Sequence, residues 1–172
     1  MRIGRRRRRS VAALVAVTVT IALATGCTQT SSGSRATLYE SIDALAADSA
    51  AIVVGTVSGQ TDDGDTTIST IEVINAPDNP TLGQNLTQQN SPVSVGDTVE
   101  VRQMTAPLLT VDDEYLLFLT PTELSGDAAD QYFVTGADAG IYVRDGDEFR
   151  RVATDSGDTL PDVISIAGTA SE

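Results

Sequence analysis

AIVVGTV, at residues 51–57, is the stretch that decides the fold class. It is short, apolar and rich in β-branched side chains, and it ends at Ser58-Gly59, which is typical of a strand that runs into a turn. A second run, TTISTIEVI at residues 66–74, follows the acidic residues 62–65. We therefore expect the two runs to form a β-hairpin. The apolar spacing of the second run breaks strict alternation, which predicts a bulge or a strand end buried on both faces.

One amphipathic helix is expected before the first strand. Thr37 and Glu40 have the spacing of a capping box, which favours a helix that starts at this point. The apolar residues fall at i, i+4, i+7 and i+8 on one helix face, namely at Leu38, Ile42, Leu45 and Ala46. A helix of about three turns would not be stable alone, so we expect its apolar face to pack on the strands that follow.

Three further strands are predicted in the second half of the chain. TVEVR at residues 98–102 alternates apolar and polar side chains, which indicates a half-exposed strand. YLLFL at residues 115–119 is continuously apolar and is expected to be a central strand, and residues 132–135 form another short run.

The clearest hairpin signal lies near the C-terminus. IYVR at residues 141–144 leads into Asp145-Gly146, a pair suited to a two-residue type I′ turn. In that register Tyr142 lies opposite Phe149. Such an aromatic pair stabilises a hairpin by about 0.2–1 kcal/mol and helps to fix its register.

These elements predict a mainly β domain with one N-terminal helix. Three segments also resemble bacterial surface proteins with an OB-like barrel: DSAAIVVGTV at residues 48–57, VGDTVEV at 95–101 and EYLLFL at 114–119. Those proteins are in turn similar to netrin-type and tissue-inhibitor-of-metalloproteinase barrels. The resemblance covers roughly residues 38–152. It implies a small five- to six-stranded OB-like barrel, with a β-sandwich as the alternative, and it bears on fold much more than on function.

The inhibitor mechanism does not transfer with the resemblance. The tissue inhibitors act through a disulfide-tied N-terminal cysteine whose amino group and carbonyl bind the protease zinc. Cys27 is the only cysteine here, so it has no disulfide partner within the chain. None of that family's functional residues has a counterpart that we can name.

The first 27 residues predict export and a lipid anchor. Arginine fills positions 5–9, and residues 11–24 form an apolar run of fourteen residues. That run has the length of a signal-peptide core, whereas a membrane-spanning helix needs roughly 20 residues. ATGC at residues 24–27 resembles the lipobox of bacterial lipoproteins, which implies cleavage before Cys27 and lipid attachment to it. The alternative is an ordinary secretory signal with a chance cysteine.

The predicted organisation is therefore a signal peptide at residues 1–26, a lipidated cysteine with a flexible tether at 27–35, and a single β domain at 36–172. The twin-arginine export pattern lacks its usual continuation, so Sec export is expected. The mature protein would sit on the outer face of the cytoplasmic membrane, or on the outer membrane if the host has one.

The composition predicts a strongly acidic domain. The chain has 11 basic and 24 acidic residues. Six arginines precede Cys27, which leaves five arginines against the 24 acids and a net charge of −19 in the mature protein. Nucleic acid and bare anionic lipid are poor partners for such a surface. With 41% hydrophobic residues, one aliphatic core is expected.

Most catalytic chemistries lack their usual residues. The sequence contains no histidine, no lysine and no second cysteine, so serine-hydrolase, cysteine-protease, Schiff-base and ordinary zinc chemistry are not expected. We expect no cofactor and no enzymatic activity. Residues 62–65, 112–114 and 145–148 offer carboxylates to calcium, but none has EF-hand spacing, and Asp and Gly are also typical of turns.

The sequence therefore predicts a non-catalytic binding or assembly module of the cell envelope, with an envelope protein or glycan as partner. The alternative is a calcium-dependent or two-carboxylate hydrolase acting on an envelope glycan. Binding is expected at loops, because the strands are committed to the core. Residues 76–92 form a long connection rich in Asn, Gln and Pro, and the candidate binding residues are Asp62, Asp63, Asp65, Asn79, Gln84 and Asn85.

Overall fold

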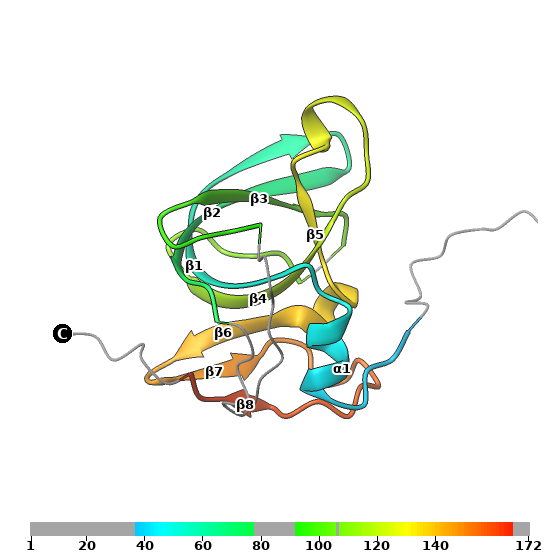
Figure 1. Cartoon of the computed structure of the whole chain (residues 1–172), viewed down its shortest axis with the longest axis vertical. Helices are drawn as coiled ribbons and strands as arrows, with labels where there is room; N and C mark the ends of the chain where they lie inside the picture. Colours follow the sequence, from blue (N-terminus) through cyan, green and yellow to red (C-terminus); the bar gives the residue numbers. More distant parts are fainter. Residues whose placement is uncertain (1–36, 78–91, 106, 167–172) are drawn as a thin grey trace, which may run out of the picture. The chain divides into compact units, whose positions relative to one another are not determined.

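The computed structural model describes residues 37–77, 92–105 and 107–166. In this part of the chain one short α-helix precedes eight strands (Figure 1). The elements are α1 (Ile42–Ala47), β1 (Ala51–Asp63), β2 (Thr66–Asn75), β3 (Thr98–Gln103), β4 (Glu114–Pro121), β5 (Tyr132–Val134), β6 (Ile141–Asp145), β7 (Glu148–Arg151) and β8 (Val163–Ile164), with 3₁₀ helices η1 (Gly126–Ala128) and η2 (Ala137–Gly140).

Five strands close into a barrel. Their order is β1-β2-β3-β5-β4, and β4 pairs again with β1 to complete the ring. The β3–β5 pair is parallel, and the other four pairs are antiparallel. This closed mixed barrel is OB-like, as the resemblance implied, and it replaces the sandwich alternative.

The remaining strands extend the sheet from β4. β6 pairs with β4, and β7 and β8 follow in antiparallel order. Figure 1 shows β6, β7 and β8, in gold to red, beside the barrel, with α1 next to them. The expected barrel thus carries a small second layer.

The described residues form two hydrophobic clusters, where the composition predicted one core. One cluster fills the barrel and includes Val53 and Leu117, and the other lies between the barrel wall, α1 and β6–β8 and includes Ile52 and Phe118. Alternate residues of β1 and β4 therefore point into different clusters. This explains why both strands are continuously apolar in sequence, because both of their faces are buried.

The predicted start of the helix is wrong. α1 begins at Ile42, and its N-cap is Ser41, whose side chain accepts a hydrogen bond from the Ala44 N–H at 3.2 Å. Leu38 is 58% exposed, while Tyr39 is buried. The reason is tertiary: the Tyr39 N–H donates to Asp158 Oδ1 at 2.7 Å, and the Tyr39 carbonyl accepts from the Thr159 N–H at 2.9 Å. The buried face from Ile42 onward is as predicted.

The β1–β2 hairpin is confirmed, and β1 is longer than expected. It continues past Gly59 to Asp63, which pairs with Thr66 across a two-residue turn. The register shifts between Val57 and Gly59, and again where Val54 gives way to Gly55. The expected irregularity is therefore present, with extra residues on both strands.

The β6–β7 hairpin is confirmed, but its predicted register is wrong. Asp145 pairs with Glu148 and Arg144 with Phe149, so the turn residues are Gly146 and Asp147. This register puts glycine at the first central position, with a φ of 66°, where a side chain would be strained. It also lays the Arg144 guanidinium 5.1 Å from the centre of the Phe149 ring.

Tyr142 and Phe149 are therefore diagonal neighbours and not an opposed pair. Tyr142 pairs with Arg151 in the ladder, and its ring lies 6.2 Å from the ring of Phe118. Both aromatic side chains remain buried in the second cluster.

Several predicted positions lie outside the described residues. These are the proposed lipid site Cys27 and three binding candidates, Asn79, Gln84 and Asn85. Among the residues described, no helix has both the length and the apolar character needed to cross a membrane.

Candidate functional site

The predicted acidic turn lies at the tip of the β1–β2 hairpin. Asp62, Asp63 and Asp65 are all exposed there, as expected for binding candidates. Gly64 makes the turn with a φ of 65°. The Thr67 hydroxyl donates to Asp62 at 3.3 Å, which ties the two strands at their tip. The sequence thus correctly predicted that these three carboxylates are exposed at one hairpin tip, but Asp62 and Asp63 belong to β1 and only Asp65 lies in the turn itself.

A half-buried arginine joins this turn to a second loop. Arg102, on β3, makes an ion pair with Asp63 at 2.9 Å through Nη2. Its Nη1 donates to Gln131 Oε1 at 2.7 Å, and Gln131 Nε2 donates to Glu100 at 2.7 Å. Gln131 closes the β4–β5 loop, residues 122–131. We call residues 62–65 together with this loop the rim, and Figure 1 shows both at the same end of the barrel.

The base of the β4–β5 loop is held by buried polar groups. The Thr122 N–H donates to the Gln131 carbonyl at 3.0 Å, and the Thr122 hydroxyl donates to the Ala128 carbonyl at 2.5 Å. Both Thr122 and Gln131 are buried. Glu123, Asp127 and Asp130 are exposed on the same loop. The rim is therefore anchored at its base and negatively charged at its surface.

The rim suits binding by charge and hydrogen bonding. Its carboxylates face solvent, whereas a carboxylic acid that donates protons near neutral pH is usually buried so that its pKa rises. Next to the rim, the pKa of Tyr132 is raised. Burial of the side chain is the main cause, and the negative charge of Asp130 adds a smaller contribution. Across residues 37–77, 92–105 and 107–166, no three acidic side chains lie together in a way that could hold a metal ion.

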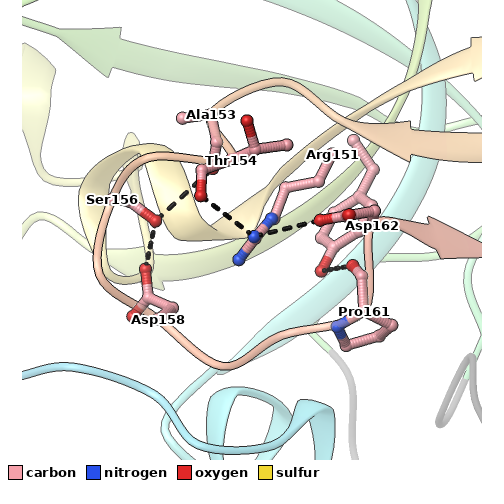
Figure 2. Close-up of polar contacts among 8 residues, drawn as sticks. Arg151, Ala153, Thr154, Ser156, Asp158, Pro161 and Asp162 are labelled. Carbon is pink, nitrogen blue, oxygen red and sulfur yellow. Dashed lines mark hydrogen bonds and ion pairs between the residues drawn. The ribbon is translucent and has the colours of Figure 1, made fainter.

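A second polar cluster lies at the C-terminal end of the sheet, and sequence reasoning missed it. Figure 2 shows the loop of residues 152–162 curving around the guanidinium of Arg151. Its Nη2 donates to Asp162 Oδ1 at 3.1 Å and to the Thr154 carbonyl at 3.4 Å. We call Arg151 and this loop the C-terminal cluster.

The loop of the C-terminal cluster is tied to the start of the domain. Asp158 Oδ1 accepts the Tyr39 N–H, and its Oδ2 accepts the Ser156 hydroxyl at 2.6 Å. The Tyr142 hydroxyl donates to the Pro161 carbonyl at 3.1 Å. Burial raises the pKa of Tyr142 far above its usual value; the positive charge of Arg151 opposes this rise, and Asp158 and Asp162 add to it.

One sequence signal could have located Arg151. Side chains alternate along a strand, so Arg151 shares the face of Phe149, while Arg150 shares the exposed face. An arginine two residues from a core phenylalanine on the same strand therefore lies on the buried face of that strand.

A scan of protein-family models finds none that matches the chain, and a search of curated proteins finds none similar to it in sequence. Functional inference therefore depends on the residues and the geometry described above.

Proposed function

We propose that the protein is a lipid-anchored envelope protein whose rim binds a partner without catalysis. The observation that carries this proposal is the Arg102 network, which joins the β1–β2 turn to the β4–β5 loop. Two loops from distant parts of the sequence thereby present one fixed surface. Preorganised loops lose less conformational entropy on binding than free ones.

The partner proposed for this surface is an envelope protein or glycan with exposed basic or hydrogen-bond-donating groups. The exposed rim acids are Asp62, Asp63, Asp65, Glu123, Asp127 and Asp130. Complementary positive charge would speed association and select against acidic partners. OB-like barrels commonly bind ligands through the corresponding loops, and this supports the choice of the rim by analogy of fold.

Membrane attachment is proposed through Cys27. The support is the lipobox-like ATGC at residues 24–27, preceded by an arginine run and a short apolar segment. Two or three acyl chains, at about 0.8 kcal/mol per buried methylene, would hold the protein on a membrane where one chain would not. The likeness to netrin-type and tissue-inhibitor barrels belongs to this proposal too, as a likeness of barrel architecture without the inhibitor mechanism.

A hydrolase finds less support than a binding module. A two-carboxylate mechanism needs one acid with a raised pKa and a second carboxylate facing it across the substrate. The rim acids are exposed to solvent, and the sequence has no histidine or lysine to serve as an alternative base.

Site-specific photo-cross-linking in cells that make the protein tests the rim. A cross-linking amino acid replaces Asp65 in one variant and Asp147 in the other. The two positions are matched, because each follows a glycine with a φ of 65° or 66° in a two-residue hairpin turn, and both are exposed. We expect a discrete adduct at position 65 that is absent at position 147.

Equal adducts at both positions, or none at position 65, would contradict the rim as the binding surface. Turnover of a glycan or peptide that is lost when one rim carboxylate is changed to its amide would contradict a non-catalytic role.

A further inference from the structure

The second half of β1 extends past the point where β4 leaves it. β4 pairs with the first half of β1, and just beyond that pairing the Val57 carbonyl accepts the Asp112 N–H at 2.9 Å. Upstream of Asp112 the chain turns toward β3, where the Leu109 N–H donates to Gln103 Oε1 at 3.1 Å. Residues 58–63 therefore have β2 on one side and no described strand on the other. They form the end of β1 at the top of the barrel in Figure 1.

The hydrogen-bond pattern shows which backbone groups lie on this open edge of β1. In an antiparallel pair, alternate residues bond to the partner strand and the residues between them face the other way. Val73 of β2 bonds on the β3 side: its N–H donates to the Asp97 carbonyl at 2.9 Å, and its carbonyl accepts the Gly96 N–H at 2.8 Å. The even-numbered residues of β2 therefore bond to β1. In the β1–β2 register this leaves the N–H and carbonyl groups of Gln60 and Asp62 on the open edge.

The open edge is ready to pair with another extended chain. Within the described residues, no backbone group bonds to the outward N–H and carbonyl groups of Gln60 and Asp62. Both residues are exposed, and an exposed strand edge is a template for a further strand. The edge is held extended by β2 and by the ion pair of Asp63 with Arg102, so pairing orders little that is not already ordered.

Charge decides which extended chain suits the open edge. The exposed carboxylates of Asp62, Asp63 and Asp65 lie along it and at its tip. A second copy of the chain would bring the same acids together, and like charges on opposed strands destabilise pairing. A segment with lysine or arginine at alternate positions would meet opposite charge, which also speeds association.

We propose that the open edge binds an extended, basic segment of a partner protein, which adds a strand beside β1. This inference rests on the proposed function, which puts partner binding at the rim, and it narrows the partner from a protein or glycan to a protein. The backbone of the added strand supplies the donors and acceptors that face Gln60 and Asp62. Basic side chains on that strand supply selectivity through the acids.

Hydrogen exchange of the full-length protein in nonionic detergent, followed by NMR, tests the added strand with a defined probe. The probe is a short amidated peptide of alternating lysine and threonine. At about 90% saturation, exchange of the Gln60 and Asp62 N–H groups should slow by about tenfold, because only the free protein then exchanges them. The same peptide with glutamate in place of lysine should have no effect. A lysine peptide methylated at every backbone nitrogen keeps the charge but cannot donate backbone hydrogen bonds, and it should not slow the exchange.

A matched pair of variants tests one hydrogen bond of the open edge. Asp62→Pro and Asp62→Ala both lose the carboxylate, but only Asp62→Pro loses the outward N–H, which the β1–β2 ladder does not use. Calorimetry with the lysine peptide should show binding about 2- to 10-fold weaker for Asp62→Pro than for Asp62→Ala, the effect of one neutral hydrogen bond. If Asp62→Pro does not fold, the exchange comparison decides alone.

Unchanged exchange at Gln60 and Asp62 with the lysine peptide, or equal slowing with the methylated peptide, would overturn the proposal. Slowing that appears without peptide as the protein concentration rises would identify a second copy as the occupant and overturn it too. A cross-link at position 65 without protection of Gln60 and Asp62 would reject strand addition while leaving the rim as a binding surface.

Discussion

Arginine is scarce in this acidic domain, and the four described arginines differ in what surrounds them. Arg102 bonds to two side chains that belong to different loops. Arg144 pairs with Glu114 at 3.3 Å and lies over the ring of Phe149. Arg150 pairs with Asp145 on the surface, and Arg151 keeps two unmet nitrogens. The first of these carries the proposed function.

We expect Arg102→Gln to destabilise the fold by about 1–3 kcal/mol. The substitution removes the hydrogen bond to the buried Gln131, and an unsatisfied buried amide carries a cost of this order. Arg150→Gln removes an ion pair in which both partners are more than half exposed, and its effect should stay below about 1 kcal/mol. Urea unfolding of both variants measures the difference. Equal losses would contradict a structural tie at the rim.

Stability should fall above about pH 10. The folded pKa of Tyr142 and that of Tyr132 both lie above the ordinary tyrosine pKa of about 10, chiefly because the side chains are buried. The unfolded chain therefore loses these protons first, and the free energy of unfolding drops by at most about 1.4 kcal/mol per pH unit for each tyrosine. Below the unfolded pKa their contribution is constant.

The chain has no lysine to titrate in this range, so the comparison with Tyr142→Phe is informative. That variant should lose less stability between pH 9 and 11.5 than the wild type, measured by urea unfolding. An equal or steeper decline in Tyr142→Phe would show that Tyr142 is not the group responsible.

At the scale of elements, β1 contains two glycines with different surroundings: Gly55 is closely packed against β2, and Gly59 has free space around it. A Cβ on Gly55 would lie 2.5 Å from the Glu72 carbonyl oxygen and 2.6 Å from a methyl group of Ile71, whereas a Cβ on Gly59 would meet nothing within 4 Å. Gly55 lies next to a register shift, and β2 approaches it so closely that a side chain does not fit there.

Gly55→Ala should therefore destabilise the domain by about 1–3 kcal/mol or more, because backbone atoms must shift to accommodate it. Gly59→Ala should be neutral or raise stability by up to about 1 kcal/mol, since it restricts the unfolded chain. Thermal and urea unfolding of this pair provide the measurement. A similar effect at the two positions would argue against the close β1–β2 contact.

Element types were largely predictable from sequence, and their boundaries were less so. The apolar runs of β1 and β4 are strong signals because each strand is buried on both faces. The start of α1 depends on the bond between Tyr39 and Asp158, which are 119 residues apart, and no local pattern contains that contact. The β6–β7 register depended on whether Gly146 holds the second or the first turn position, and both choices satisfy the local sequence.

The candidate site was predictable only in part. The acids of the β1–β2 turn were found from their composition, because Asp and Gly in a short connection are typical of an exposed turn. Their link to the β4–β5 loop passes through Arg102, which lies 39 residues from Asp63 and 29 from Gln131. Only the closure of the barrel brings these residues together.

At the scale of the whole molecule, charge should oppose compaction. With a net charge of −19 after Cys27, repulsion among the acids is screened as the Debye length falls from about 30 Å at 0.01 M salt to about 10 Å at 0.1 M. We expect the melting temperature to rise across this range of sodium chloride. A flat or falling melting temperature would mean that the acids are compensated locally.

Mass spectrometry of the mature N-terminus tests the proposed membrane anchor most directly, because lipid attached to Cys27 is what would display the binding module on a membrane. For protein extracted with detergent from bacterial membranes, we expect a first residue of Cys27 that carries a diacylglyceryl group, and a Cys27→Ser variant that is either uncleaved or released. A mature protein that begins at another residue, or that begins at Cys27 with an unmodified thiol, would contradict the proposal.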